Sequence, residues 1–188
     1  MGNIVKINNK QRRRIIFRLA LMNQRKRANY LKKKRIFYQF GDNCRWAPYT
    51  IPSEPYMVSI GNHVRIAANV TFITHDIIDS LFLEDESVRE MMKDKIKHLR
   101  FHIDTIEIGD YVMVGANSTI LYGVKIGSHS IIAAGSVVTK DVPEGSIVGG
   151  NPATIIGNYY DLAKKRCEKR RPTSSDDLES IIQGFWKK

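Results

Sequence analysis

Residues 108–150 decide the fold, and they read IGDYVMVGANSTILYGVKIGSHSIIAAGSVVTKDVPEGSIVGG. A large apolar residue recurs at every sixth position from Ile108 to Val138, and the same spacing occurs earlier, over residues 60–72. The apolar positions are Ile60, Ile66, Phe72, Ile108, Val114, Ile120, Ile126, Ile132 and Val138. An α-helix would repeat about every 3.6 residues and an amphipathic strand about every two, so neither accounts for this spacing.

A sustained period of six indicates short strands joined by tight corners. The residue after each apolar position is often glycine or alanine, which we expect at the corner because glycine tolerates strained dihedral angles. The fourth residue after it is small or β-branched, as in Val64, Ser118 and Ser136. Three such sides make a coil of about 18 residues, and stacked coils bury a continuous core. The sequence therefore predicts an all-β chain, with a parallel β-helix over residues 39–157.

The repeat is interrupted once. After Phe72 the next apolar position would be residue 78, but the pattern resumes at Ile108, so 30 residues are inserted. The insert covers about residues 76–105 and is expected to contain a short helix or loop. Long excursions from a compact repeat are usually functional.

The positive charge lies at the N-terminus. Residues 1–38 contain 13 lysines and arginines and no acidic residue, whereas the other 150 residues contain 17 basic and 19 acidic residues. Ile15, Ile16, Leu19 and Met22 have helical spacing, so we expect a basic helical arm that packs on the first coil. Its charges would face an anionic membrane surface, or would simply be solvated. No nucleic-acid partner is expected, because no RNA-binding module accompanies the arm.

The remaining features predict a cytoplasmic protein, peripheral at most to the inner membrane surface. There is neither a membrane-spanning apolar run nor a signal-peptide pattern. Cys44 and Cys167 are too isolated to form a disulfide framework, and we expect inert thiols. Residues 158–188 leave the repeat and are expected to form a helical cap or tail, with residues 158–170 as a helix over the last coil.

Residues 108–150, followed by Asn-Pro-Ala at 151–153, closely resemble the hexapeptide-repeat acyltransferases. The nearest resemblance is to sugar, capsule, lipopolysaccharide and xenobiotic O-acetyltransferases. It covers roughly residues 40–157, and its most specific parts are residues 133–143 and 150–153. The resemblance implies a left-handed parallel β-helix and acetyl-CoA as acyl donor. It also implies a homotrimer with active sites between subunits, walled by a loop that matches the insert.

The resemblance implies that His75, where the insert leaves the repeat, is the catalytic base. A neutral hydroxyl is a poor nucleophile, and the ordinary pKa of histidine, about 6.5, suits it to remove the proton. Glu54 and Asp76 are expected at the acceptor site, although Asp76 also has the character of a turn-forming residue. No covalent intermediate is expected.

Acetyl-CoA is expected along small or exposed corner positions. By the resemblance, these are Ala116, Ala134, Thr139 and Lys140. Small side chains allow the donor to reach backbone groups, and the lysine can pair with a phosphate of the donor.

The sequence does not decide between several classes of acceptor. A hydroxyl of a sugar or polysaccharide precursor is the first reading, and a streptogramin-type acceptor or an amino sugar, which would give N-acetylation, is the alternative. A remote alternative is a metal protein, because His63, His98 and His102 have a spacing loosely like that of the zinc ligands of γ-class carbonic anhydrases. We expect no metal, because two of these histidines lie in the insert.

Overall fold

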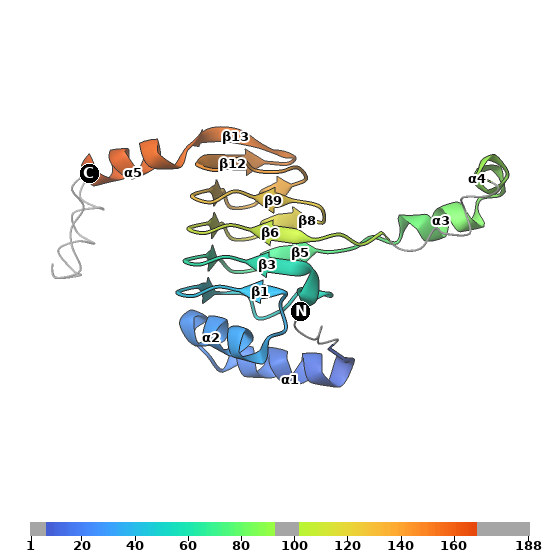
Figure 1. Ribbon diagram of the computed structural model, residues 1–188, viewed down its shortest axis with the longest axis horizontal. Coiled ribbons are helices and arrows are strands. Elements are labelled where there is room, and N and C mark those ends of the chain that lie inside the picture. The colour runs from blue at the N-terminus through green and yellow to red at the C-terminus, as the bar shows by residue number, and fades with distance from the viewer. Residues whose placement is uncertain (1–6, 93–101, 169–188) are drawn as a thin grey trace, which may run out of the picture.

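The computed structural model describes residues 7–92 and 102–168. Figure 1 shows a stack of short strands with two helices at the N-terminal end of the stack and one arm projecting from its side. One sheet contains β1 (Gln39–Phe40), β3 (Val58–Ile60), β6 (Ile106–Ile108) and β9 (Lys125–Ile126). The second contains β2 (Arg45–Trp46), β4 (Arg65–Ile66), β7 (Met113–Val114), β10 (Ile131–Ile132), β12 (Ser146–Gly150) and β13 (Ala153–Asn158). The third contains β5 (Thr71–Ile73), β8 (Thr119–Leu121) and β11 (Val137–Val138).

The strand register confirms the coil length and the insert. Ile120 of β8 pairs in parallel with Val138 of β11, which stands three hexads further along the chain. Phe72 of β5 pairs with Ile120, so the chain between these two residues contains one coil and, in addition, the insert. In the first coil, Trp46 pairs with Ile66, which makes this coil slightly longer than three hexads. The extra length lies before Val58, in the segment that contains the short 3₁₀ helix η1 (Pro55–Met57).

The interior of the stack is built from the periodic residues. All nine apolar positions of the repeat are buried, and none is more than 6% exposed. The fourth residues after them are buried as well, except Asp76 after Phe72, and Ser118 and Ser136 donate their hydroxyls to the carbonyl oxygen of Ala133. The period of six therefore describes which side chains face the core.

The corners differ from the expectation in one respect. The left-handed backbone conformation falls on the third residue after the apolar position, not on the small residue that follows it directly. It is adopted by His63, Asn69, Tyr111, Asn117, Gly123, His129 and Gly135. Glycine at position 115 is instead required by close packing, because a Cβ there would lie 2.5 Å from the backbone nitrogen of Ala134 in the next coil.

Two helices close the N-terminal end of the stack. They are α1 (Asn9–Ala20) and α2 (Gln24–Lys34), and Asn8 and Asn23 cap their first turns with side-chain hydrogen bonds. Ile15 and Leu19 of α1 and Leu31 of α2 are buried in the same core as the first coil. The basic arm therefore covers the open end of the β-helix.

The insert begins as an arm with two short helices, α3 (Ile78–Glu84) and α4 (Glu86–Met91), which project from the side of the stack (Figure 1). At the C-terminal end, β13 folds back antiparallel to β12. The helix α5 (Tyr159–Glu168) has no buried residue and points away from the stack (Figure 1). The strand β13 thus pairs with the last coil, in place of the expected helix. The predicted tail beyond residue 168 lies outside the described residues.

None of the helices within residues 7–92 and 102–168 combines the length and the apolar character that a membrane span requires.

Ile108 and Glu107 offer a direct test of the inward and outward alternation on β6. Ile108 is buried and Glu107 is exposed. Because Ile108→Ala leaves a cavity between stacked coils, we expect it to lower the free energy of unfolding by about 2–5 kcal/mol. Glu107→Ala should change it by no more than about 0.5 kcal/mol. Urea denaturation measures both, and equal losses would contradict the assigned register.

Candidate active site

His75 stands just beyond β5, where the insert leaves the stack. The chain returns beside its own exit, because the backbone N–H of Asp76 donates to the carbonyl oxygen of His102 at 3.0 Å. The N–H of Asp104 donates to the carbonyl oxygen of Thr74 at 3.2 Å, and His75 forms an antiparallel bridge with Ile103. The two stems of the insert therefore fix the backbone that carries His75.

The imidazole of His75 is hydrogen-bonded to Glu54. Nδ1 of His75 lies 2.8 Å from Oε2 of Glu54, and the hydroxyl of Thr74 donates to the same carboxylate oxygen at 2.5 Å. Both ionisable side chains are largely shielded, with 32% of His75 and 19% of Glu54 exposed. Since a carboxylate only accepts hydrogen bonds, Nδ1 carries the hydrogen, and in the neutral ring the lone pair is then on Nε2.

The segment that leads into Glu54 is hydrogen-bonded to the N-terminal helix α1. It directly precedes η1, in the irregular segment that lengthens the first coil. The guanidinium of Arg12 on α1 donates to the carbonyl oxygens of Ile51 at 2.9 Å, Pro52 at 2.8 Å and Ser53 at 2.5 Å. One side chain thus satisfies three consecutive carbonyls of a segment that makes no strand pairing.

Asp76 is hydrogen-bonded to Tyr122. The hydroxyl of Tyr122, which follows β8, donates to Oδ2 of Asp76, and the N–H of Ile78 donates to Oδ1 at 3.0 Å. The hydrogen bond from Tyr122 is the main reason that the pKa of Asp76 lies below its ordinary value, and the same bond raises the pKa of the Tyr122 hydroxyl. The bond to Ile78 is the turn-forming contact that the sequence suggested for an aspartate here.

The residues predicted to bind acetyl-CoA lie before and after the strands of the third sheet. Ala116 and Ala134 lie at the same corner in successive coils, before β8 and β11. Thr139 and Lys140 follow β11 and are exposed. Continuing the register of β8 and β11 past their last paired residues puts Lys140 level with Tyr122, on the side of the stack from which the insert leaves.

The two described histidines of the alternative metal site, His63 and His102, contact different tyrosines. The ring of His63 stacks on Tyr111 with centroids 4.6 Å apart, whereas the ring of His102 lies 4.9 Å from that of Tyr122. His98 lies outside the described residues. In the parts of the chain that the structure describes, no three histidine, cysteine, aspartate or glutamate side chains form a group that could hold a metal ion.

Three residues around His75 were not anticipated from the sequence: Arg12, Thr74 and Tyr122. The repeat itself could have indicated Tyr122. Positions 74 and 122 are equivalent in the coils on either side of the insert, so they lie one above the other in the stack. For Arg12 no periodic signal exists, because the carbonyls that it binds belong to the irregular segment.

Comparisons with known proteins agree with this architecture. Residues 105–140 match the family model described as Bacterial transferase hexapeptide (six repeats). The chain is 35% identical over 139 residues to the putative acetyltransferase YvoF of Bacillus subtilis (strain 168), which covers 73% of this chain and 70% of that protein. It is 40% identical over 128 residues to Protein CapG of Staphylococcus aureus, covering 66% of this chain and 68% of that protein.

Among solved structures, one similar chain is a hexapeptide-repeat acetyltransferase from Vibrio cholerae O1 biovar eltor complexed with acetyl coenzyme A. The TM-score is 0.53 at 26% sequence identity, with 80% of this chain and 88% of that chain covered. The chain described here therefore belongs to the hexapeptide-repeat acetyltransferase family. It is an acetyltransferase with a β-helix fold.

The hydrogen bond between Tyr122 and Asp76 can be tested by titration. We expect Tyr122→Phe to raise the pKa of Asp76 toward its ordinary value, because the largest cause of its lowering is removed. Since the folded-state pKa is lowered, ionised Asp76 stabilises the fold above its ordinary pKa, and this stabilisation is lost as the pH falls through the folded value. The variant should weaken that acid dependence. Carboxyl NMR titration measures the pKa, with Tyr111→Phe as control, and an unchanged value would contradict the contact.

Proposed function

We propose that this acetyltransferase transfers the acetyl group of acetyl-CoA to a hydroxyl of a sugar or polysaccharide precursor, with His75 as general base. The observation that carries the proposal is the hydrogen bond from Nδ1 of His75 to Glu54 at the root of the insert. A histidine whose Nδ1 is held by a carboxylate has its tautomer and ring orientation fixed, and a general base needs both.

His75 would act through Nε2. It takes the proton of the acceptor hydroxyl as that oxygen attacks the thioester carbon, and it gives the proton to the sulfur as the carbon–sulfur bond breaks. The products are an acetate ester and the free thiol of coenzyme A. The Glu54 carboxylate stabilises the imidazolium that exists between these two proton transfers.

The donor is inferred from the relatives and from the surface of the stack. The similar Vibrio cholerae structure contains acetyl coenzyme A. In this chain, the small residues Ala116 and Ala134 leave the corner backbone accessible, and the exposed Lys140 offers a cation for a phosphate. The two groups lie at opposite ends of one sheet, as suits a site to which neighbouring subunits contribute different ends.

The homotrimer and the left-handed sense of coiling belong to the same proposal and come from the family resemblance. One feature of the arm supports an intersubunit role. It carries Ile77, Ile78, Leu81, Phe82 and Met91 with 38% or more of each residue exposed. An arm that projects from its own stack with apolar side chains is suited to pack on another subunit.

The carbohydrate acceptor is inferred from the family resemblance, which also implies that Glu54 contacts the acceptor. Beside a base that removes a proton from a hydroxyl, Asp76 and Tyr122 offer polar groups that sugars commonly hydrogen-bond. A streptogramin-type acceptor and an amino sugar are the alternatives, and a panel of acceptors distinguishes them.

The general-base role predicts a large kinetic effect. We expect His75→Ala to lower kcat/KM by about 10²–10⁴-fold, because proton removal in the transition state is lost. Release of the coenzyme A thiol measures the rate, with maltose, a galactoside, an amino sugar and a streptogramin as acceptors. His63→Ala, which removes a ring from a corner on another side of the coil, is the matched control and should stay within about threefold.

A rate for His75→Ala within about threefold of wild type would refute the base, since base catalysis contributes far more than that. Turnover only with the amino sugar or only with the streptogramin would replace the carbohydrate hydroxyl as acceptor while leaving the acetyl donor in place.

Glu54 is predicted to act on the base and not on binding of the donor. We expect Glu54→Gln to lower kcat by about 10–100-fold with little change in KM for acetyl-CoA, because the amide no longer stabilises the imidazolium. Glu54→Asp should restore part of the rate if the carboxylate is what matters. A change confined to KM for the acceptor would instead assign Glu54 to acceptor binding, as the family resemblance implied.

A further inference from the structure

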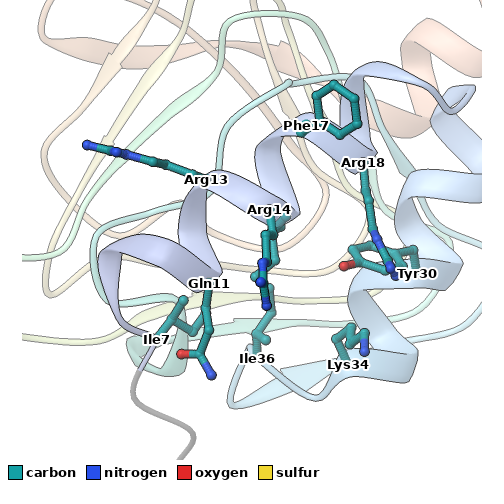
Figure 2. Close-up of a pocket in the computed structure, with 10 residues that line it drawn as sticks. Ile7, Gln11, Arg13, Arg14, Phe17, Arg18, Tyr30, Lys34 and Ile36 are labelled. Atoms are coloured by element: carbon teal, nitrogen blue, oxygen red, sulfur yellow. The ribbon is translucent and has the colours of Figure 1, made fainter.

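The outward side of the N-terminal helices contains a cationic pocket. A cavity of about 640 Å³ opens between α1 and α2 and has Arg14, Arg18, Lys34 and Tyr30 among its lining residues. Figure 2 shows Arg14 and Arg18 leaving α1 on the same side, with Arg18 directed toward Tyr30, whereas Arg13 extends away from them. The guanidinium carbon of Arg18 lies 5.9 Å from the centre of the Tyr30 ring, and Nζ of Lys34 lies 6.0 Å from it.

Three other basic residues of the same helices have partners within the chain. Arg12 and Arg27 are used internally, the first on the segment before Glu54 and the second on the carbonyls of Leu19 and Ala47. Lys32 pairs with Asp42. Within the described residues, Arg14, Arg18 and Lys34 form no ion pair, and residues 1–38 contain no acidic side chain. The pocket therefore concentrates positive charge that no carboxylate of the described chain neutralises.

Two large apolar side chains of this helical segment are exposed, and the first of them, Phe17, lines the pocket. Phe17 is 67% exposed and Leu21 is 73% exposed. Leu21 caps the C-terminal end of α1 four residues after Phe17, so we expect both on one side, whereas Ile15 and Leu19 occupy the buried side. A helix with an apolar pair set among arginines on its outer surface has the composition of an interfacial helix, whose apolar groups enter the acyl boundary while its cations meet headgroups.

We propose that the two helices dock on an anionic membrane surface and that the pocket between them binds the phosphate of an anionic lipid. Arg14, Arg18 and Lys34 supply the positive charge, while Phe17 and Leu21 enter the lipid layer. A nucleic acid would match the charge but would leave the exposed apolar pair without a role, so the membrane is the better match. This inference does not depend on the proposed acetyl acceptor.

The test is co-sedimentation of the full-length protein with vesicles. One set contains phosphatidylcholine alone, and the other contains phosphatidylcholine with about one third phosphatidylglycerol. We expect binding to the anionic vesicles only, weakened as NaCl rises from about 0.1 M to about 0.5 M. The triple variant Arg14→Gln, Arg18→Gln, Lys34→Gln should lower the partition coefficient about tenfold or more.

A matched variant removes three charges elsewhere. Lys164, Lys165 and Arg166 lie on the exposed helix α5, and changing all three to Gln should leave vesicle binding within about twofold. The double variant Phe17→Ser, Leu21→Ser should lower binding about tenfold, including at the higher salt concentration, because it removes the apolar contribution. Circular dichroism checks folding, and thiol release with a soluble acceptor should be unchanged in all these variants.

Several results would overturn the inference. The first is that the protein binds neutral vesicles as well as anionic ones. The second is that the triple variant at Arg14, Arg18 and Lys34 binds as well as wild type. The third is that the α5 variant loses as much binding as that triple variant. Short RNA that binds as tightly as the vesicles, without any need for Phe17 and Leu21, would assign the cationic surface to nucleic acid. Loss of vesicle binding with intact thiol release, or the reverse, separates this inference from the proposed enzymatic function.

Discussion

The structure depends on one packing constraint: each inward apolar side chain rests on its equivalent in the next coil. Because successive side chains of a strand face opposite sides, a slip of one residue would turn a buried isoleucine outward. The register is thereby fixed along the whole stack, and with it the positions of the polar residues just past each strand. Thr74, Tyr122 and Lys140 come to share one column for this reason, although the insert and two coils of chain separate the first from the last.

The structure could be predicted from the sequence where the period of six extends, but not where that period stops. The core positions and the length of the insert follow from the spacing of six, whereas the role of His75 as base is a prediction from the family resemblance. The contact between Glu54 and His75 did not follow, because Glu54 lies in a segment that breaks the period and whose path depends on Arg12. Nor did β13, since an antiparallel return has no place in a parallel repeat.

The helix α1 connects two parts of the molecule that the sequence treats as separate. Its inner side contributes Ile15 and Leu19 to the core, and Arg12 supports the segment that ends at Glu54. Its outer side carries the exposed Phe17 and the pocket arginines. The basic arm is therefore not an appendage that can be removed without consequence. Its removal would uncover the first coil and take away the Arg12 hydrogen bonds to the segment before Glu54.

Parallel strands stack at a nearly constant spacing of about 4.8 Å, so the coil number of a residue is also a measure of its height. His75 belongs to the second coil from the end that α1 and α2 close, which puts it only about 10 Å above those helices. If these helices rest on a surface to which the acceptor is tethered, the β-helix would fix the height of His75 above that surface. Hydroxyls near the tether would meet the imidazole, and those far along the tethered chain would pass above it.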